Sequence, residues 1–328
     1  MSNVKSIITL LFSFVTISFY SNYAEEDPDK NTWNEAGIPL YHNFTSQEYG
    51  GHFQNWFVTE DNRGFILVAN NDGLLEYDGV NWRRYNLGGT PYQSLRSIVQ
   101  DKSGTLYCGT NNHFGYLTID VNGNYKFNSF LNKLDEKYRN FNDIWYTLVI
   151  DSSVFFVTHN YLFQWQNQKL TVTETANSEN IFHTAFTIKN KLYVRQSGIG
   201  LMQLKGEVLE KIPNGEIFAD IPVYFMEPYD DNSIFIGTDS GDFYLYDGKE
   251  LSKFKTNAKK YLQKNHLYCG ASLDNGLYAL GTRLGGLGII DKNGSLLKVF
   301  DNTQGLQDNS VWNLHKDQHG NEQCHSER

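Results

Sequence analysis

Short apolar runs alternate with clusters of turn-forming residues along most of this chain, and residues 54–87 show the pattern most clearly. The apolar runs there are Trp56 to Thr59, Phe65 to Ala69, Leu74 to Tyr77 and Trp82 to Leu87, separated by EDNRG, NNDG and DGVN. Asp, Asn and Gly supply the hydrogen bonds and positive φ angles that tight turns need. The stretch therefore predicts four short strands in an antiparallel meander, and one such sheet needs neighbours to bury both faces.

The meander is repeated along the chain. The turn after the first strand recurs at Gly64, Gly104, Ser153, Asn190, Asn232, Gly276 and Gly320, at spacings of 40, 49, 37, 42, 44 and 44 residues. This period is typical of four-stranded propeller blades. We therefore predict an all-β fold, a β-propeller with about six complete blades plus the start of a seventh, which leaves an incomplete ring.

The two ends of the chain do not follow the repeat, which we place at residues 54–320. Residues 1–24 have a basic start and an apolar core of signal-peptide length, which predicts export to the periplasm or the extracellular space. Residues 25–53 form an entry segment with a piece that resembles a closing strand. Residues 321–328 form an atypical tail, so blade seven is expected to consist of one strand, in a chain truncated at its C-terminus.

Composition narrows the class of partner. The chain has 15% aromatic residues and a formal net charge of −9, which argues against nucleic acid as a partner. Cys108, Cys269 and Cys324 have no metal-like spacing, so we predict no zinc site, no cofactor and no disulfide framework. One polar stretch, residues 129–141, is a plausible helix.

Particular repeats carry a family resemblance. The segments IVQDKSGTLYCGT and VWNLHKDQHG resemble the two-component regulator propeller repeat. The opening segment, EYGGHFQNWFVTEDNRGFILVANNDGLLEYDG, is similar to the first repeat of sensory proteins that carry a triple-tyrosine module after their propeller. The resemblance implies an exported ligand-sensing propeller at the front of a membrane-bound regulator, whose membrane-spanning and output modules are missing from this chain. It supplies no ligand.

The geometry of a meander places candidate ligand-binding residues on one face. The turns between second and third strands share this face, the near face, with the loops between blades. The residues that enter the first strands there are expected to form a rim around the central channel: Trp56, Arg96, Tyr146, His183, Tyr224, Tyr268 and Trp312. The second-to-third turns add Asn71 and His113. Aromatic faces with a few polar groups suit small molecules such as carbohydrates, although the same residues could instead fill gaps between blades.

Catalytic motifs are missing from the sequence. The His residues lack the spacing of a metal site, and no GxSxG occurs. The main hypothesis is therefore a non-catalytic sensor, which could act as a homodimer. The alternatives are an exported propeller enzyme, such as a polysaccharide lyase or hydrolase, and a scaffold propeller that binds proteins.

Overall fold

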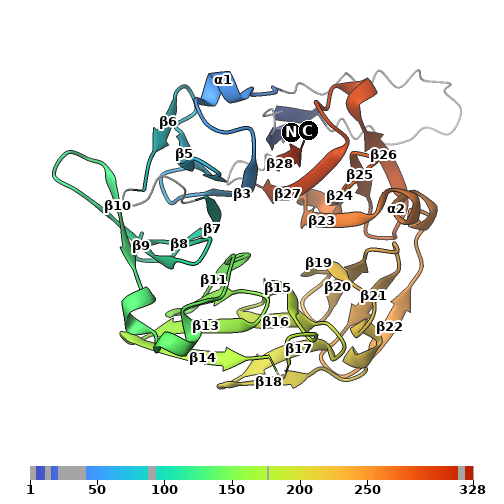
Figure 1. The fold of residues 1–328 in the computed structure, drawn as a ribbon. Coiled ribbons are helices and arrows are strands. Elements are labelled where there is room, and N and C mark those ends of the chain that lie inside the picture. Colours follow the sequence, from blue (N-terminus) through green and yellow to red (C-terminus); the bar gives the residue numbers. More distant parts are fainter. Residues whose placement is uncertain are drawn as a thin grey trace, which may run out of the picture.

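The computed structural model describes residues 42–87, 94–175 and 177–316 in full, and the backbone of residues 5–11, 16–20 and 322–327. Seven four-stranded sheets surround a central channel (Figure 1). Six of them are antiparallel meanders with consecutive strands in order, and we number these sheets as blades 1 to 6 along the chain. The structure thus confirms the predicted all-β propeller of four-stranded blades.

Each blade runs outward from the channel. The first and innermost strands are β3 (Asn55–Glu60), β7 (Leu95–Gln100), β11 (Tyr146–Ile150), β15 (Phe182–Ile188), β19 (Val223–Pro228), β23 (Leu267–Ser272) and, in blade 7, β27 (Ser310–Lys316). The second strands of blades 1 to 6 are β4 (Ile66–Asn70), β8 (Leu106–Thr110), β12 (Ser153–Val157), β16 (Lys191–Gln196), β20 (Ile234–Thr238) and β24 (Tyr278–Thr282).

The outer half of each blade is completed by the third and fourth strands. The third strands are β5 (Gly73–Tyr77), β9 (Phe114–Ile119), β13 (Tyr161–Gln166), β17 (Gly200–Lys205), β21 (Phe243–Tyr246) and β25 (Leu287–Ile290). The fourth strands are β6 (Trp82–Tyr85), β10 (Tyr125–Ser129), β14 (Lys169–Glu174), β18 (Val208–Lys211), β22 (Leu251–Phe254) and β26 (Leu296–Phe300).

Burial explains why the second strands read as continuous apolar runs. Every residue of β4, β12, β20 and β24 is buried, because both faces of these strands pack against a neighbouring blade. Six apolar clusters fill the spaces between successive blades from blade 1 to blade 7. In contrast, β6 and β22 at the periphery have no buried residue. The core is therefore a ring of inter-blade layers.

The seventh sheet has more strands than the sequence predicted. Residues Glu322–Glu327, in the segment expected to be an atypical tail, form β28, which pairs antiparallel with β27. The sheet is completed by β1 (Lys5–Leu11) and β2 (Thr16–Tyr20), with β1 parallel to β28. These two strands lie in the segment for which the sequence predicts a signal peptide. Figure 1 shows both chain ends at this sheet.

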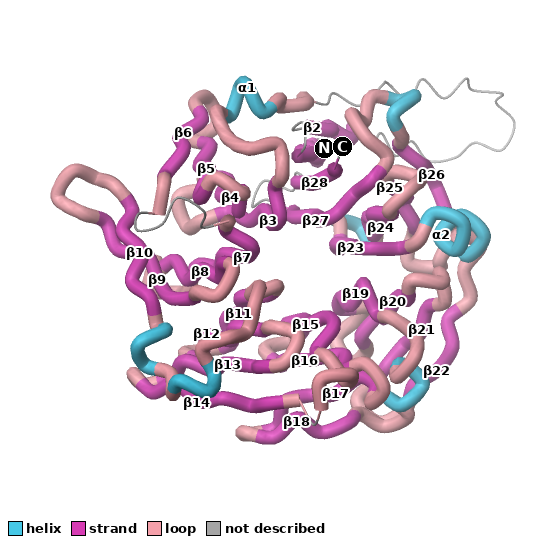
Figure 2. The backbone as a smooth tube through the Cα atoms, viewed as in Figure 1, coloured by secondary structure: helices cyan, strands magenta, loops and turns pink. Residues whose placement is uncertain are grey.

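Helical structure is confined to short connections, mostly near the edge of the disc (Figure 2). The helices are α1 (Ser46–Tyr49), α2 (Lys259–Asn265), η1 (Leu131–Lys133), η2 (Glu136–Tyr138), η3 (Gly215–Phe218), η4 (Asp274–Gly276) and η5 (Asn302–Gln304). The stretch 129–141 thus contains two 3-10 turns in place of one helix. In the described part of the entry segment, Thr45 and Glu48 cap α1 reciprocally, as in a capping box.

Candidate ligand-binding site

The second-to-third turns are built on a recurring buried threonine at the end of the second strand. Thr110, Thr238 and Thr282 are fully buried, and the Oγ1 atoms of Thr238 and Thr282 each donate across the turn to a carbonyl oxygen, of Asp242 and Gly286, at 2.9 Å. Backbone N–H groups of the same turns donate back to these hydroxyls. This closure fixes the residue that follows the threonine on the near face, for example Asp239 or Arg283.

The glycine before this threonine makes room for the next blade. A Cβ atom at Gly109 would collide with Ile144, and one at Gly281 would collide with Val311. Ile144 and Val311 are buried residues that stand immediately before Trp145 and Trp312. The Gly-Thr motif therefore both shapes a turn and seats the start of the following first strand.

A β-bulge opens the first strand at the rim position. The pairing between first and second strands skips one residue at Trp56, Arg96, His183, Tyr224, Tyr268 and Trp312. A bulge redirects the side chain of the extra residue. The structure thus places six of the seven predicted rim residues in the same position of their blades.

The seventh prediction, Tyr146, is displaced by one residue. In blade 3 the amide of Trp145 donates to Val157 O at 2.9 Å while Tyr146 pairs with Val157, so Trp145 holds the bulge position. The sequence analysis assigned Ser153 to the turn, but Ile150 pairs with Ser153, so the turn of blade 3 ends one residue earlier, at Ser152. Tyr146 instead packs against the cluster between blades 3 and 4. From here on, the rim comprises Trp56, Arg96, Trp145, His183, Tyr224, Tyr268 and Trp312.

On blades 1 to 3 the rim is held by an ion-paired arginine. The Arg96 guanidinium lies 3.8 Å from the ring centroid of Trp56 and 5.6 Å from that of Trp145. Its Nε donates to Asp143 Oδ1 at 2.9 Å, so its charge has a counterion. The Trp56 indole donates to Asn71 Oδ1 at 2.8 Å, which ties the rim to the β4–β5 turn. The predicted residue Asn71 is therefore in direct contact with the rim.

On blades 4 to 7 the rim is a row of adjacent rings. His183 and Tyr224 have centroids 5.2 Å apart, Tyr224 and Tyr268 4.9 Å, and Tyr268 and Trp312 4.6 Å. Arg283, from the β24–β25 turn, donates through Nη2 to Tyr224 OH at 2.6 Å, and Tyr224 OH lies 3.3 Å from His183 Nε2. Three blades are thereby joined through one phenol.

The electrostatics of this side follow from burial and from arginine. Burial lowers the pKa of His183 to about 4, and the positive charges of Arg195 and Arg283 add to the effect. Burial raises the pKa of Tyr224, although Arg283 opposes the shift. Burial likewise raises the pKa of Tyr146, with the Tyr268 and Tyr224 phenols adding to the shift. At neutral pH His183 is therefore an uncharged imidazole and Tyr224 a neutral phenol.

Four buried side-chain nitrogen atoms on this face have no hydrogen-bond partner among the described residues. They are Arg96 Nη1, His183 Nδ1, Arg283 Nε and Trp312 Nε1. Buried donors normally find a protein or water acceptor, because leaving one unpaired costs about 1–3 kcal/mol. A concentration of such donors around a channel is the arrangement expected where an acceptor-bearing ligand or ordered water binds.

Two further features of the near face are the predicted residue His113 and a pair formed by His266 and Asp239. His113 lies on the β8–β9 turn, where its carbonyl oxygen accepts from Thr110 N at 2.9 Å, but its side chain has no hydrogen bond, ion pair or ring contact with the described residues. His266 and Asp239 form a pair, with Nδ1 and Oδ2 3.3 Å apart. This pair could not be predicted from the sequence, because the two residues belong to different blades and are part of no motif.

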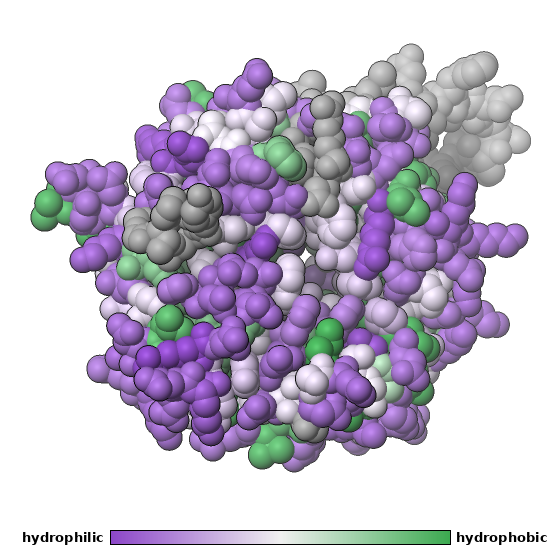
Figure 3. Space-filling view, viewed as in Figure 1, coloured by the Kyte–Doolittle hydropathy of each residue, from purple (hydrophilic) through white to green (hydrophobic). Residues whose placement is uncertain are grey.

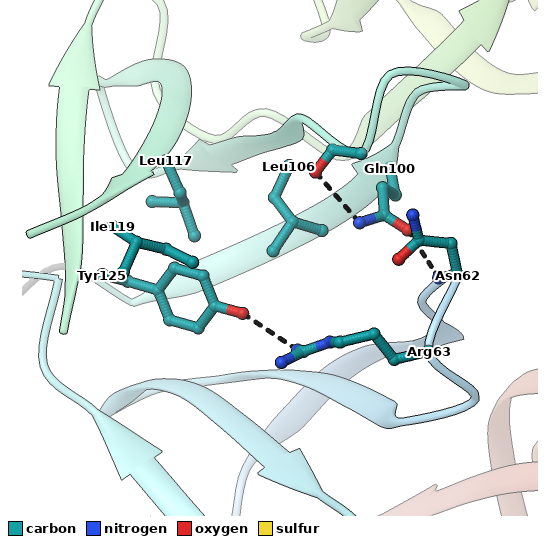
Figure 4. Close-up of a pocket in the computed structure, with 8 residues that line it drawn as sticks. Asn62, Arg63, Gln100, Leu106, Leu117, Ile119 and Tyr125 are labelled. Carbon is teal, nitrogen blue, oxygen red and sulfur yellow. Dashed lines mark hydrogen bonds between the residues drawn. The ribbon is translucent and has the colours of Figure 1, made fainter. Parts of the chain in front are cut away.

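Outside the rim, the structure contains a cavity of about 190 Å³ between blades 1 and 2. Figure 4 shows Leu106, Leu117 and Ile119 on one side, with Arg63 and Tyr125 joined by a hydrogen bond of 3.1 Å. Arg63 also pairs with the buried carboxylates of Asp61 and Glu76. These partners already satisfy the main polar groups of the cavity, so it is a weaker candidate site than the rim.

The described ranges hold no cluster of three or more His, Cys, Asp or Glu side chains suited to a metal ion. Within the same ranges no helix is long and apolar enough to span a bilayer. Cys108 is a buried free thiol. The surface viewed in Figure 3 is mainly hydrophilic, with hydrophobic residues scattered singly.

Comparison with known proteins identifies the fold. No family model matches the chain, and no curated protein matches it. The extracellular domain of the BT4673 hybrid two-component system from B. thetaiotaomicron matches with a TM-score of 0.63 and 21% identity, over 82% of this chain and 36% of that one. Virginiamycin B lyase from Staphylococcus aureus matches with a TM-score of 0.59 and 11% identity, over 80% and 88%.

A third match is the WD40 propeller domain of Doa1, with a TM-score of 0.62, 16% identity, and coverage of 83% of this chain and 89% of that domain. At these identities the likeness shows a β-propeller. One of these propeller structures is the extracellular domain of a two-component system. The chain spans little more than a third of the length of that domain.

Proposed function

We propose that this chain is an exported sensor propeller that binds a small ligand at the channel rim and forms the N-terminal part of a membrane-bound signal-transduction regulator. The observation that carries the proposal is the rim itself. Seven blades each contribute an aromatic or cationic side chain to one face, and four buried N–H groups there lack an acceptor. The likeness to an extracellular two-component domain supports the sensory role.

Aromatic faces combined with fixed donors suit a ligand that has both flat apolar faces and hydrogen-bond acceptors, and carbohydrates meet this description. Signalling would require that the ligand binds one arrangement of the propeller, or of a homodimer, more tightly than another. A ligand can shift a conformational equilibrium only by this difference in affinity.

The binding proposal is tested by a thermal-shift screen of mono- and oligosaccharides against the protein. A ligand that raises the melting temperature of the parent protein should lose its effect in Trp56→Ala and in Arg96→Ala. The matched control is Phe53→Ala, because Phe53 is an exposed aromatic residue close in sequence. A shift that survives both rim substitutions would show that the ligand binds elsewhere.

The regulatory part of the proposal is tested on the adjoining coding sequence. Further propeller repeats, a triple-tyrosine module and a membrane-spanning helix are expected downstream of codon 328. An isolated stop codon with no remnant of these modules would count against a sensor of this class.

A second candidate function is an exported propeller enzyme acting on a polysaccharide as a lyase or hydrolase. It is favoured by one observation, the near-face pair of His266 and Asp239. A paired His and carboxylate can act in general acid–base chemistry. The test is product formation from acidic and neutral polysaccharides, with His266→Ala as the variant. Turnover that His266→Ala abolishes would establish the enzyme, and no turnover with any substrate that binds would favour the sensor.

A further inference from the structure

The two arginines at the rim differ in their charge partners. Arg96 has the carboxylate of Asp143 at 2.9 Å, so its charge is matched within the protein. Arg283 forms no ion pair with any described residue, and its one side-chain hydrogen bond goes to the neutral Tyr224 phenol. The Arg283 Nε is buried and has no acceptor. An arginine in this setting has a positive charge without a counterion and an N–H group without an acceptor, so it can bind an anionic group.

Neighbouring groups strengthen this positive field. Arg195 is 4% exposed and donates only to the backbone carbonyl oxygens of Phe218 and Ala219, so its hydrogen bonds leave the charge without a carboxylate contact. The acidic residues nearby are Asp220, which acts on Arg195 electrostatically, and Asp239, which contacts His266 and also acts electrostatically on His183 and Tyr224. Neither forms an ion pair with Arg283.

The backbone holds Arg283 in place. Its amide donates to the carbonyl oxygens of Asn265 and His266, both at 3.0 Å, where the chain leaves α2. Tyr261, from the same helix, donates through its hydroxyl to Gly285 O at 2.9 Å. A Cβ at Gly285 would collide with Asn265, which shows how closely the helix end packs on the turn. A charged group fixed in advance gains affinity because little ordering is left to the binding step.

Tyr224 also determines which nitrogen of His183 carries the proton. Arg283 donates to the phenol oxygen, so the phenol hydrogen is free to point at His183 Nε2, 3.3 Å away. The neutral imidazole then carries its proton on Nδ1, the atom that has no partner. On blades 4 to 6, the rim therefore offers two hydrogen-bond donors, Arg283 Nε and His183 Nδ1.

We propose that Arg283, Tyr224 and His183 form an oxyanion subsite of the rim, so that the ligand carries a carboxylate or sulfate group beside a ring that stacks on Tyr224 and Tyr268. A uronic acid is the simplest molecule with both parts. The inference rests on the proposed ligand-binding function and specifies the class of ligand.

The test is calorimetric titration at fixed ionic strength with glucuronate, glucose, acetate and sulfate. Glucuronate should bind, glucose should bind at least about tenfold more weakly, and Arg283→Gln should weaken glucuronate binding by about tenfold or more. Tyr224→Phe should also weaken glucuronate binding, because the ring remains but the hydroxyl that links Arg283 to His183 is lost. The control is Arg84→Gln, because Arg84 is an exposed arginine on β6. Binding of acetate or sulfate as tight as that of glucuronate would identify a free small anion as the ligand.

Misfolding of Arg283→Gln is excluded by requiring an unchanged near-ultraviolet circular dichroism spectrum, and Arg283→Lys gives a second variant that retains the charge. Equal affinity for glucose and glucuronate, no binding of any of the three anions, or full affinity in Arg283→Gln would overturn the inference. A neutral oligosaccharide whose binding is lost in Trp56→Ala but kept in Arg283→Gln would overturn it while leaving the proposed function standing.

Discussion

At the scale of single residues, Glu227 is a carboxyl group whose ionised form is disfavoured by burial. It lies on the innermost strand β19, and Ser272 Oγ donates to it at 3.1 Å. Burial raises the pKa of Glu227 to about 7, and the serine hydrogen bond offsets this only in part. The folded state therefore favours the protonated form, so the contribution of this group to stability is present below about pH 4.5 and is lost as the pH rises through about 7.

Glu227→Gln should therefore stabilise the protein at pH 8, by about 1–3 kcal/mol, and change little at pH 4.5, because the amide is a neutral analogue of the protonated acid. Urea unfolding at the two pH values measures this. The exposed Glu207→Gln is the control and should show no such pH dependence. Equal effects of Glu227→Gln at both pH values would contradict the assignment.

His183 has the opposite effect on the pH dependence of stability. Its pKa is lowered to about 4 by burial, by Arg195, by His159 and by Arg283, with Asp239 acting against them. The unfolded chain, with a pKa near 6.5, binds a proton more readily, so stability is expected to fall as the pH drops from about 6.5 to about 4. His183→Gln should reduce the loss of stability between pH 7 and pH 5. Urea midpoints at both pH values test this, with His113→Gln as a control.

At the scale of elements, four blades carry a glycine at or next to the first residue of the third strand. A Cβ at these glycines would collide with a carbonyl oxygen near or beyond the end of the fourth strand: Tyr85 O at Gly73, Asn128 O at Gly115, Gly215 O at Gly200 and Phe300 O at Gly286. Gly286 also has φ of +79°. Any side chain there would push the outermost strand away from the turn that carries Arg283.

Gly286→Ala should consequently destabilise the protein by about 2–4 kcal/mol. Gly79→Ala is the matched control, because Gly79 has φ of +94° but open space where the Cβ would be, and it should cost about 1 kcal/mol. Chemical denaturation of the two variants compares them directly. A Gly286→Ala cost equal to that of Gly79→Ala would show that the strand shifts freely.

The repeat and most rim positions could be predicted from the sequence, but the contacts between blades could not. The glycines and asparagines at the turns made the repeat visible, and counting from them located six of the seven rim residues. The position was wrong by one residue in blade 3, because Ser153, which was taken as part of the turn, is already the first residue of β12. Contacts between blades, such as Arg96 with Asp143 or Arg283 with Tyr224, could not be predicted, since they join positions 47 and 59 residues apart.

At the scale of the whole molecule, blade 7 joins blade 1 to blade 6. β27 packs against both β3 and β23. Asn313, on β27, accepts a hydrogen bond through Oδ1 from Val58 N at 3.2 Å. The sequence predicted one strand here, because the tail lacks the apolar pattern of a second strand, and pairing with distant segments is not encoded locally.

Asn313→Ala should weaken this junction, because the Val58 amide loses its acceptor, at a cost of about 1–2 kcal/mol. Hydrogen exchange of the Val58 amide should become faster than in the parent protein. Exchange at amides of β12, in the fully buried strand of blade 3, serves as the reference and should change less. Unchanged exchange at Val58 would contradict the role of this hydrogen bond.

The central claim is that a small ligand binds at the channel rim of the propeller. It is tested most directly by a crystal structure of the protein with a ligand found by the thermal-shift screen. The ligand should contact Trp56 or Tyr224 and accept hydrogen bonds from at least one of the unpartnered N–H groups of Arg96, His183, Arg283 and Trp312. A ligand bound on the opposite face, or in the cavity between blades 1 and 2, would contradict the claim.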